Sequence, residues 1–430
     1  MAHSHAVSGD IEPAGRVVPV TAARGRRRSA LALACVLLPL LAATIAGVVL
    51  LWPHHPRPAS SLDFAAGGVT FPRGEVTRLT KGPCAVSDPG ADVPAPPPTS
   101  GPAPVCGTAT VRITDTSDAG REVTVTVPPE VARDGVGVQV ILLKTPVAAG
   151  APTTFALYDV QRGRPLALMA VVFALVAVGV ARLRGLLSLV GLGFAAVVVV
   201  GFMLPALVAG ENPLWVGLTA AAAIIFVVLY LAHGVSLRTT TALLGTFAGL
   251  AVTAGIGVVA VRLVRLNGVS SEENSMLAQV AGQIDLPALL TCGIVLAGLG
   301  VLNDVTITQA SAVWELREAA PGMAPRRLYR TAMRIGRDHI ASTVYTIVFA
   351  YAGAALPVLL LIELYAQPLG SVLTSADIAE ELVRTMASAI GLVLAVPITT
   401  GLAVAVATAG GRSAHPTVSA ESAHTRGTTG

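Results

Sequence analysis

The sequence is poor in charged and aromatic residues. Asp, Glu, Lys and Arg make up 13% of its 430 residues, and Phe, Trp and Tyr make up 4%. Soluble globular chains carry about 25% charged residues, so this composition excludes an ordinary soluble domain. The sequence also lacks a Walker loop, a dinucleotide fingerprint and a G-x-S-x-G nucleophile elbow. We therefore expect no enzymatic activity and no cofactor.

Cysteine is also scarce, and the four cysteines have no spacing typical of a zinc site. Cys35 and Cys292 lie inside apolar runs, where a small apolar role is the default. Cys84 and Cys106 bracket a Pro-rich segment. In an oxidising compartment we predict a disulfide between them, which closes a loop of about twenty residues. Two free thiols are the alternative.

Long apolar runs are abundant, since 53% of the residues are hydrophobic and the mean hydropathy is +0.71. Crossing a bilayer takes about 17 to 25 apolar residues. The sequence therefore predicts an α-helical polytopic membrane protein with about eight transmembrane helices. Their predicted ranges are 30–52, 165–181, 185–208, 213–232, 239–264, 286–304, 339–363 and 384–409. Only "RLRG" separates the second and third, which favours a tight hairpin.

Arginine distribution predicts the orientation, because basic residues near span ends remain in the cytoplasm. With eight spans, sixteen arginines fall on the side of the N-terminal "RGRRR", whereas the short loops on the other side hold three, Arg262, Arg265 and Arg384. This predicts a plasma-membrane protein with a cytoplasmic N-tail (1–29) and C-tail (410–430), both disordered. The first apolar run is longer than a usual signal-peptide core, so we expect an uncleaved anchor.

Residues 53–164 have a different composition and predict a small extracytoplasmic β domain. The strand-like runs are "GEVTRLT", "TATVRIT", "EVTVTVP", "VGVQVILLK" and "TTFALYDV", separated by turn residues. We expect a barrel of oligonucleotide-binding-like shape, interrupted by the Pro-rich insertion 86–104. The topogenic arginines explain the net charge of +4, so nucleic acid is not an expected partner.

Charged residues near the membrane gather at predicted span ends: Asp285, Asp304, Asp338, His339 and Glu363. In "GVLNDVTITQASAVWELRE", helical spacing places Asp304, Thr308, Ser311 and Glu315 on one face, with Gln309 near that stripe. The basic segment "RRLYRTAMRIGRDH" follows. We therefore predict a cytoplasmic helical hairpin over 303–338, inside a membrane domain spanning 165–409.

Two interpretations of this polar cluster remain open. In the first, Asp304 and Glu315 form ion pairs with Arg334 or Arg337 and only dock the hairpin. In the second, Asp304 and His339, with Asp338, Glu315 and Gln309 nearby, take up and release a proton or cation, as ionisable residues on transport paths do. A metal site has less support, because one His with scattered acids has no diagnostic spacing.

Glycines within the spans indicate close helix packing. Gly245, Gly249, Gly298 and Gly300 would let helix backbones approach one another, although a hinge role is an alternative.

Several long motifs resemble the YibE/F-like family of bacterial multispan membrane proteins. They are the segment quoted above, "GRDHIASTVYTIVFAYAGAALPVLLL", "AGQIDLPALL", "LYLAHGVSLRTTTALLGTFAGL" and "AEELVRTMASAIGLVLAVPITT", within about residues 140–408. The resemblance implies an integral membrane architecture and no established activity. Asn303 departs from the family pattern, where an Asp is more usual beside Asp304. Residues 290–350 also resemble, more loosely, the SecD/SecF-type and RND permeases, which implies a fold only.

We therefore expect a transporter or transport-accessory permease of unknown substrate, with protons as the driving ion and Asp304 as the titrating group. The alternative is a non-transporting envelope protein whose β domain binds an extracytoplasmic protein while the helices anchor it in the lipid bilayer. The oligomeric state does not follow from the sequence.

Overall fold

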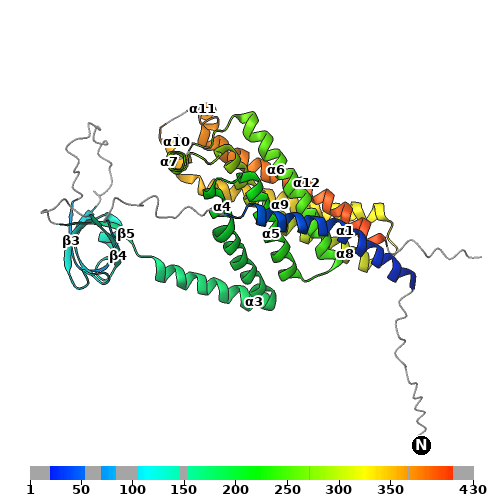
Figure 1. The fold of residues 1–430 in the computed structure, drawn as a ribbon, viewed down its shortest axis with the longest axis horizontal. Helices are drawn as coiled ribbons and strands as arrows, with labels where there is room; N and C mark the ends of the chain where they lie inside the picture. Colours follow the sequence, from blue (N-terminus) through cyan, green and yellow to red (C-terminus); the bar gives the residue numbers. More distant parts are fainter. Residues whose placement is uncertain are drawn as a thin grey trace, which may run out of the picture. The chain divides into compact units, whose positions relative to one another are not determined.

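The computed structural model describes residues 20–53, 69–83, 105–145, 153–270, 272–365 and 368–409 (Figure 1). The chain forms two compact units, Arg57–Val180 and the combination of Met1–Pro56 with Ala181–Gly430. The predictions for the C-tail 410–430, the Pro-rich insertion 86–104 and Cys84 lie outside the described residues. Cys106 is disulfide-bonded, and Cys35 and Cys292 are free. The pairing of Cys106 with Cys84 stays a prediction.

The smaller unit contains a five-stranded antiparallel sheet, which confirms the predicted small β domain. Its strands follow the order β3-β2-β1-β4-β5, and the end strands β3 and β5 contact each other. A sheet whose end strands meet is a small barrel, in line with the predicted oligonucleotide-binding-like shape. The elements are β1 Arg73–Pro83, β2 Val105–Ile113, β3 Glu122–Val127, helix α2 Pro129–Asp134, β4 Gln139–Thr145 and β5 Thr154–Val160.

Strand alternation builds the core of this barrel. In β3 the valines 123, 125 and 127 are buried, whereas Glu122, Thr124 and Thr126 are exposed. Successive side chains of a strand point to opposite faces, so one face of β3 fills the barrel and the other meets solvent. The same core contains Val76, Ala109, Val111, Ile113, Val131, Val140 and Leu142.

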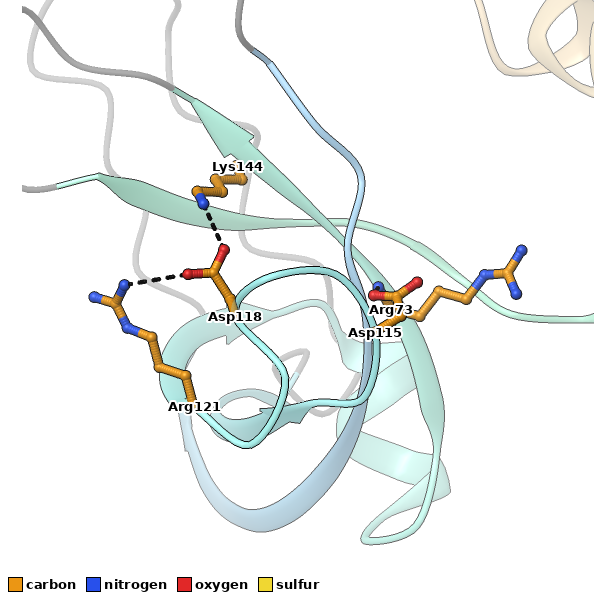
Figure 2. A network of polar contacts seen from close by, with 5 residues as sticks. All are labelled: Arg73, Asp115, Asp118, Arg121 and Lys144. Carbon is orange, nitrogen blue, oxygen red and sulfur yellow. Dashed lines mark hydrogen bonds and ion pairs between the residues drawn. The ribbon is translucent and has the colours of Figure 1, made fainter.

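Charged side chains join the loop between β2 and β3 to other parts of the barrel (Figure 2). Asp118 accepts a hydrogen bond from Lys144 Nζ of β4, and its carboxylate lies 3.7 Å from Arg121 Nη1. The guanidinium of Arg121 and the ammonium of Lys144 lie 5.3 and 6.0 Å from the ring centroid of Phe155 in β5. These contacts hold the two ends of the sheet together.

Asp118→Asn in the full-length chain is expected to loosen the barrel. The Asp118 side chain is 15% exposed and that of Lys144 is 23% exposed, so the change leaves a largely buried cation without its carboxylate. We expect a loss of about 1–3 kcal/mol in barrel stability, seen as faster amide hydrogen exchange in β2 to β5 and unchanged exchange in the helices. The control is Glu122→Gln, which breaks a half-exposed ion pair with Arg112 and should change little. Equal exchange in both variants would contradict the expectation.

The larger unit is helical, and α3 begins in the smaller one. The helices are α1 Val20–Leu50, α3 Gly163–Val198, the π-helix η2 Val199–Met203, α4 Leu204–Ala209, α5 Pro213–His233, α6 Leu237–Val264, α7 Glu272–Val280, α8 Leu286–Ala319, α9 Pro325–Ala354, α10 Leu356–Leu364, α11 Leu369–Leu373 and α12 Ala376–Thr408. Helix α1 begins ten residues before the predicted span, inside the tail predicted to be disordered, because "VTAARGRRRSA" is rich in the good helix formers Ala and Arg.

Within the described residues, six helices are long and apolar enough to cross a bilayer, and α9 with α10, bent by 61°, makes a seventh if the pair is one span. The predicted runs 165–181 and 185–208 fall in one helical stretch, Gly163–Ala209. This stretch is interrupted at Arg182, where φ is 54° and ψ is −132°. The predicted number of eight is reached only if this break separates two spans.

Side-chain caps fix where three of the apolar helices begin. The side chains of Asn212, Ser236 and Asp285 accept hydrogen bonds from backbone N–H groups in the first turns of α5, α6 and α8. A cap satisfies N–H groups that have no partner inside the helix. Asp285, one of the acids predicted at span ends, is therefore a helix cap.

The predicted helical hairpin is present as α8 and α9, which are joined by a short turn at 320–324. Helix α8 continues without a break from the apolar run through Asp304 to Ala319, and α9 begins after Ala324 and continues through His339. The hairpin is thus an extension of two long helices, packed side by side with α6 and α12 (Figure 1).

Candidate functional site

Helices α6, α8 and α12 form the centre of the larger unit, and glycines allow them to approach closely. A Cβ atom on Gly249 of α6 would lie 2.7 Å from Leu302 Cδ2 of α8 and 2.9 Å from Ala395 Cβ of α12. A Cβ atom on Gly245 would overlap the hydroxyl of Thr399. Side chains at these two positions would push the helices apart, which agrees with the predicted packing role.

Gly298 of α8 and Gly391 of α12 both lie against Thr253 of α6. A Cβ atom on Gly298 would lie 3.2 Å from Thr253 Cγ2, and one on Gly391 would overlap Thr253 Oγ1. Gly300 differs, because it is exposed and a Cβ atom there would meet nothing within 4 Å. The packing role predicted for Gly300 is therefore wrong: it lies two residues from Gly298, and such residues do not share a helix face.

The order of the contacting residues along the three helices gives the helix directions. Residues 298–309 of α8 and 391–400 of α12 advance together, while the contacting residues of α6 descend from 253 to 245. Helices α8 and α12 are therefore parallel to each other and antiparallel to α6. A polar side chain on one helix thus meets a predictable level of the other two.

Hydrogen bonds between buried polar side chains cross these interfaces. The hydroxyls of Thr246 in α6 and Thr306 in α8 lie 2.6 Å apart. Gln309 Nε2 of α8 donates to the carbonyl of Ala332 in α9 at 3.0 Å and to Thr400 Oγ1 in α12 at 2.8 Å. Because Gln309 is only 3% exposed, these bonds connect three helices away from solvent.

Some buried hydroxyls on the same helices have no such partner. Ser388 Oγ and Thr399 Oγ1 of α12 are enclosed and form no hydrogen bond with the part of the chain that the structure describes. Buried polar groups are usually satisfied, and those that are not call for an unseen water, an ion or a functional role. We call the buried polar side chains between α6, α8 and α12 the polar seam; its members are Thr246, Thr253, Thr306, Gln309, Ser388, Thr399 and Thr400.

Asp304 and His339 meet on the exposed face of α8, near the level of Gln309 along the helix, as the sequence predicts. The distance between His339 Nε2 and Asp304 Oδ2 is 3.9 Å. The Asp304 side chain is 72% exposed, whereas that of His339 is 31% exposed and its Nε2 atom is enclosed without a hydrogen-bond partner among the described residues. A small movement of either side chain would bring the two atoms within hydrogen-bonding distance.

The predicted stripe on α8 is correct in part. Asp304, Thr308 and Glu315 are exposed on one face of the continuous helix, but Gln309 is buried on the other side. Five residues correspond to about 140° around a helix, so Gln309 lies far from Asp304 on the surface of α8. Glu315 Oε1 lies 3.7 Å from Arg238 Nη1 of α6.

The predicted ion pairs of Arg334 and Arg337 are wrong within the described residues. Both arginines and Asp338 are exposed on α9, and no ion pair involves them. Helix α9 packs through its other face, which contains the buried residues Leu328, Ala332 and Gly336. The first interpretation of the cluster, in which these arginines dock the hairpin, therefore has no contact to support it.

Sequence reasoning missed His233, Glu380 and most of the polar seam. His233, at the end of α5, interacts electrostatically with Asp304, which therefore lies near two histidines. Glu380 of α12 is buried. One sequence pattern could have indicated the polar seam: Gly245, Gly249 and Thr253 follow one another at intervals of four residues, which places them on one face of α6. In the described part of the chain, no group of three or more His, Cys, Asp or Glu side chains is placed to hold a metal ion.

Comparison with known proteins assigns the chain to a protein family. A family model described as "YibE/F-like protein" matches residues 169–409, which contain the whole polar seam and the pair of Asp304 and His339. No curated protein matches the chain, and no solved structure matches it.

Proposed function

The chain belongs to the YibE/F-like family, and we propose that this integral membrane protein is a proton-coupled transporter or transport-accessory permease. The observation that supports the proposal best is the polar seam, a row of buried hydroxyl and amide groups along the helix interfaces that includes two hydrogen-bonded pairs and ends near the level of Asp304 and His339. Polar groups inside a bilayer cost free energy, so they usually face protein or water and mark a path for ions or substrates.

Asp304 and His339 are the groups that can hold a proton at this end. In our proposal, Asp304 Oδ2 binds a proton from the aqueous side, and His339 Nε2, at 3.9 Å, exchanges a proton with it after a small rotation. An imidazole is suited to this because each of its ring nitrogens can hold or release a proton. The polar seam offers hydroxyl groups that both donate and accept hydrogen bonds, which proton transfer through side chains and water requires.

The arginine distribution supports a cytoplasmic position for the Asp304 end. Arg317, Arg334 and Arg337 lie in the segment that follows Asp304, and Arg238 lies 3.7 Å from Glu315 of the same helix. Basic residues of short loops stay in the cytoplasm. With eight spans, both termini would also be cytoplasmic, and the β unit would lie outside the plasma membrane.

The alternative, in which the helices only anchor a β domain that binds a partner, has less support. An anchor needs apolar helices and close packing, both of which the glycines provide. It has no need for enclosed hydroxyls without partners at Ser388 and Thr399, which destabilise the bundle.

Proton flux tests the proposal. The full-length protein is reconstituted into vesicles that contain a pH-sensitive dye, a pH gradient is imposed, and the membrane potential is clamped with potassium and valinomycin. We expect the gradient to decay at least about tenfold faster than in protein-free vesicles, because a protein path replaces the hydrocarbon barrier. A decay rate equal to that of protein-free vesicles would contradict the proposal. Flux driven by a sodium gradient instead would overturn the choice of proton.

A further inference from the structure

Glu380 of α12 is a buried carboxyl group for which the fold provides no visible partner. The residue is 7% exposed, and its Oε1 atom is enclosed without a hydrogen-bond donor in the described part of the chain. The neighbouring Glu381 is different, because its carboxylate lies 3.2 Å from Arg384 Nη1. A buried charge without a partner costs several kcal/mol, so a burial of this kind needs a reason.

The position of Glu380 relates it to the polar seam. Ser388, Gly391 and Thr399 follow it by 8, 11 and 19 residues, which places all four within about 100° on one face of α12. This face is the one that packs against α6 and α8. From Glu380 to Thr400 the helix rises about 30 Å, the thickness of a bilayer's hydrocarbon core. Glu380 therefore lies at the end of the seam opposite Gln309 and Asp304.

A recess open to solvent lies at the same end of the bundle. It has a volume of about 180 Å³ between α5, α6 and α8, and its lining includes Arg262, Asp285 and Thr291. Val261 also lines this recess and packs in one cluster with Val383, which is one helical turn from Glu380. The recess therefore brings water to the same end of the bundle as Glu380.

We propose that Glu380 is the second proton-binding site of the chain, at which protons enter the polar seam from the side opposite Asp304. The carboxylate takes a proton from a hydronium ion in the recess, which leaves water and a neutral carboxyl group. The neutral carboxyl group then gives its proton to a water molecule between Glu380 and Ser388, so that a hydronium ion forms and the carboxylate is restored. This inference rests on the proposed transport function.

The charged side chains that the structure describes around Glu380 do not stabilise its carboxylate through an ion pair. The charged residues at this end include Asp377, Glu381 and Arg384 on α12, Arg262 and Arg265 at the end of α6, and Asp285 before α8. Helix α9 contributes Tyr351, which interacts electrostatically with Glu381 and Arg384. Within the described residues, none of them forms an ion pair or a hydrogen bond with Glu380.

The test compares Glu380→Gln, Glu380→Asp and Glu381→Gln in the same vesicle assay, with thermal unfolding in detergent as a check of folding. Because a proton carrier contributes at least about a hundredfold in typical acid–base steps, we expect Glu380→Gln to lower proton flux by roughly tenfold or more. Glu380→Asp keeps the carboxyl group and should retain most of the flux. Glu381→Gln changes a partly buried ion pair outside the proposed path and should leave the flux unchanged.

Two results would overturn the inference. One is wild-type flux in folded Glu380→Gln; the other is equal loss in folded Glu380→Gln and Glu380→Asp, which would indicate a structural role. If the wild type has no flux, the proposed function itself fails, and the two failures are thereby distinguished. If Glu380→Gln does not fold, Glu380→Asp is the deciding variant. Its folded form must carry proton flux and must show an infrared carboxyl band that shifts with pH on the recess side. The same band must be absent from a Glu380→Ala variant.

Discussion

Gly391→Leu is expected to prevent α6, α8 and α12 from packing. The Cβ atom alone would overlap Thr253 Oγ1 and would lie 3.0 Å from Thr253 Cβ and 3.4 Å from its Cα. Rotating the Thr253 side chain cannot relieve this, because the Cβ and Cα atoms belong to the α6 backbone region and do not move with χ1. Rotation would also break the hydrogen bond from Thr253 Oγ1 to the Gly249 carbonyl, which is 2.9 Å long.

The expected cost of Gly391→Leu is about 3 kcal/mol or more in the free energy of unfolding, at the upper end for overpacked cores. This loss runs against helix propensity, which by itself favours Leu over Gly. Thermal unfolding and size-exclusion chromatography in detergent measure it. The matched control is Gly300→Leu on α8, where the new side chain would point into open space. If both variants unfold at the wild-type temperature, the close packing described for the three helices is incorrect.

Asp304→Asn is expected to lower proton flux by roughly tenfold or more, because the amide keeps the size and polarity of the side chain but cannot bind a proton at its oxygen in the same way. Asp304 is exposed, so the change should have little effect on folding. The matched control is Asp338→Asn, which removes an exposed carboxylate next to His339 in sequence that forms no ion pair with the described residues. Flux in this control should equal that of the wild type.

Local sequence patterns predicted the elements of the fold. The five strands could be found because valine alternates with polar residues in segments such as "EVTVTV", and only one face of a barrel strand is buried. The apolar helices could be found by length alone. Their exact number could not, because a stretch as long as Gly163–Ala209 is ambiguous without knowing how the backbone behaves at Arg182.

The pair of Asp304 and His339 could be predicted because a hairpin of two helices brings nearby segments together. Contacts between segments that are distant in sequence could not be predicted. Gln309 donates a hydrogen bond to Thr400, which is 91 residues away in sequence, and Gly391 packs against Thr253 across an even longer separation. One sequence contains no information about which helices are neighbours, so the seam and Glu380 appear only once the helices are packed.

Proton flux through reconstituted wild type and Asp304→Asn, measured side by side at the same pH gradient and clamped potential, tests the central claim most directly. The account predicts rapid decay of the gradient with the wild type and with Asp338→Asn, and decay close to that of protein-free vesicles with Asp304→Asn. Equal decay with the wild type and Asp304→Asn, or a wild-type rate no faster than that of protein-free vesicles, would contradict it.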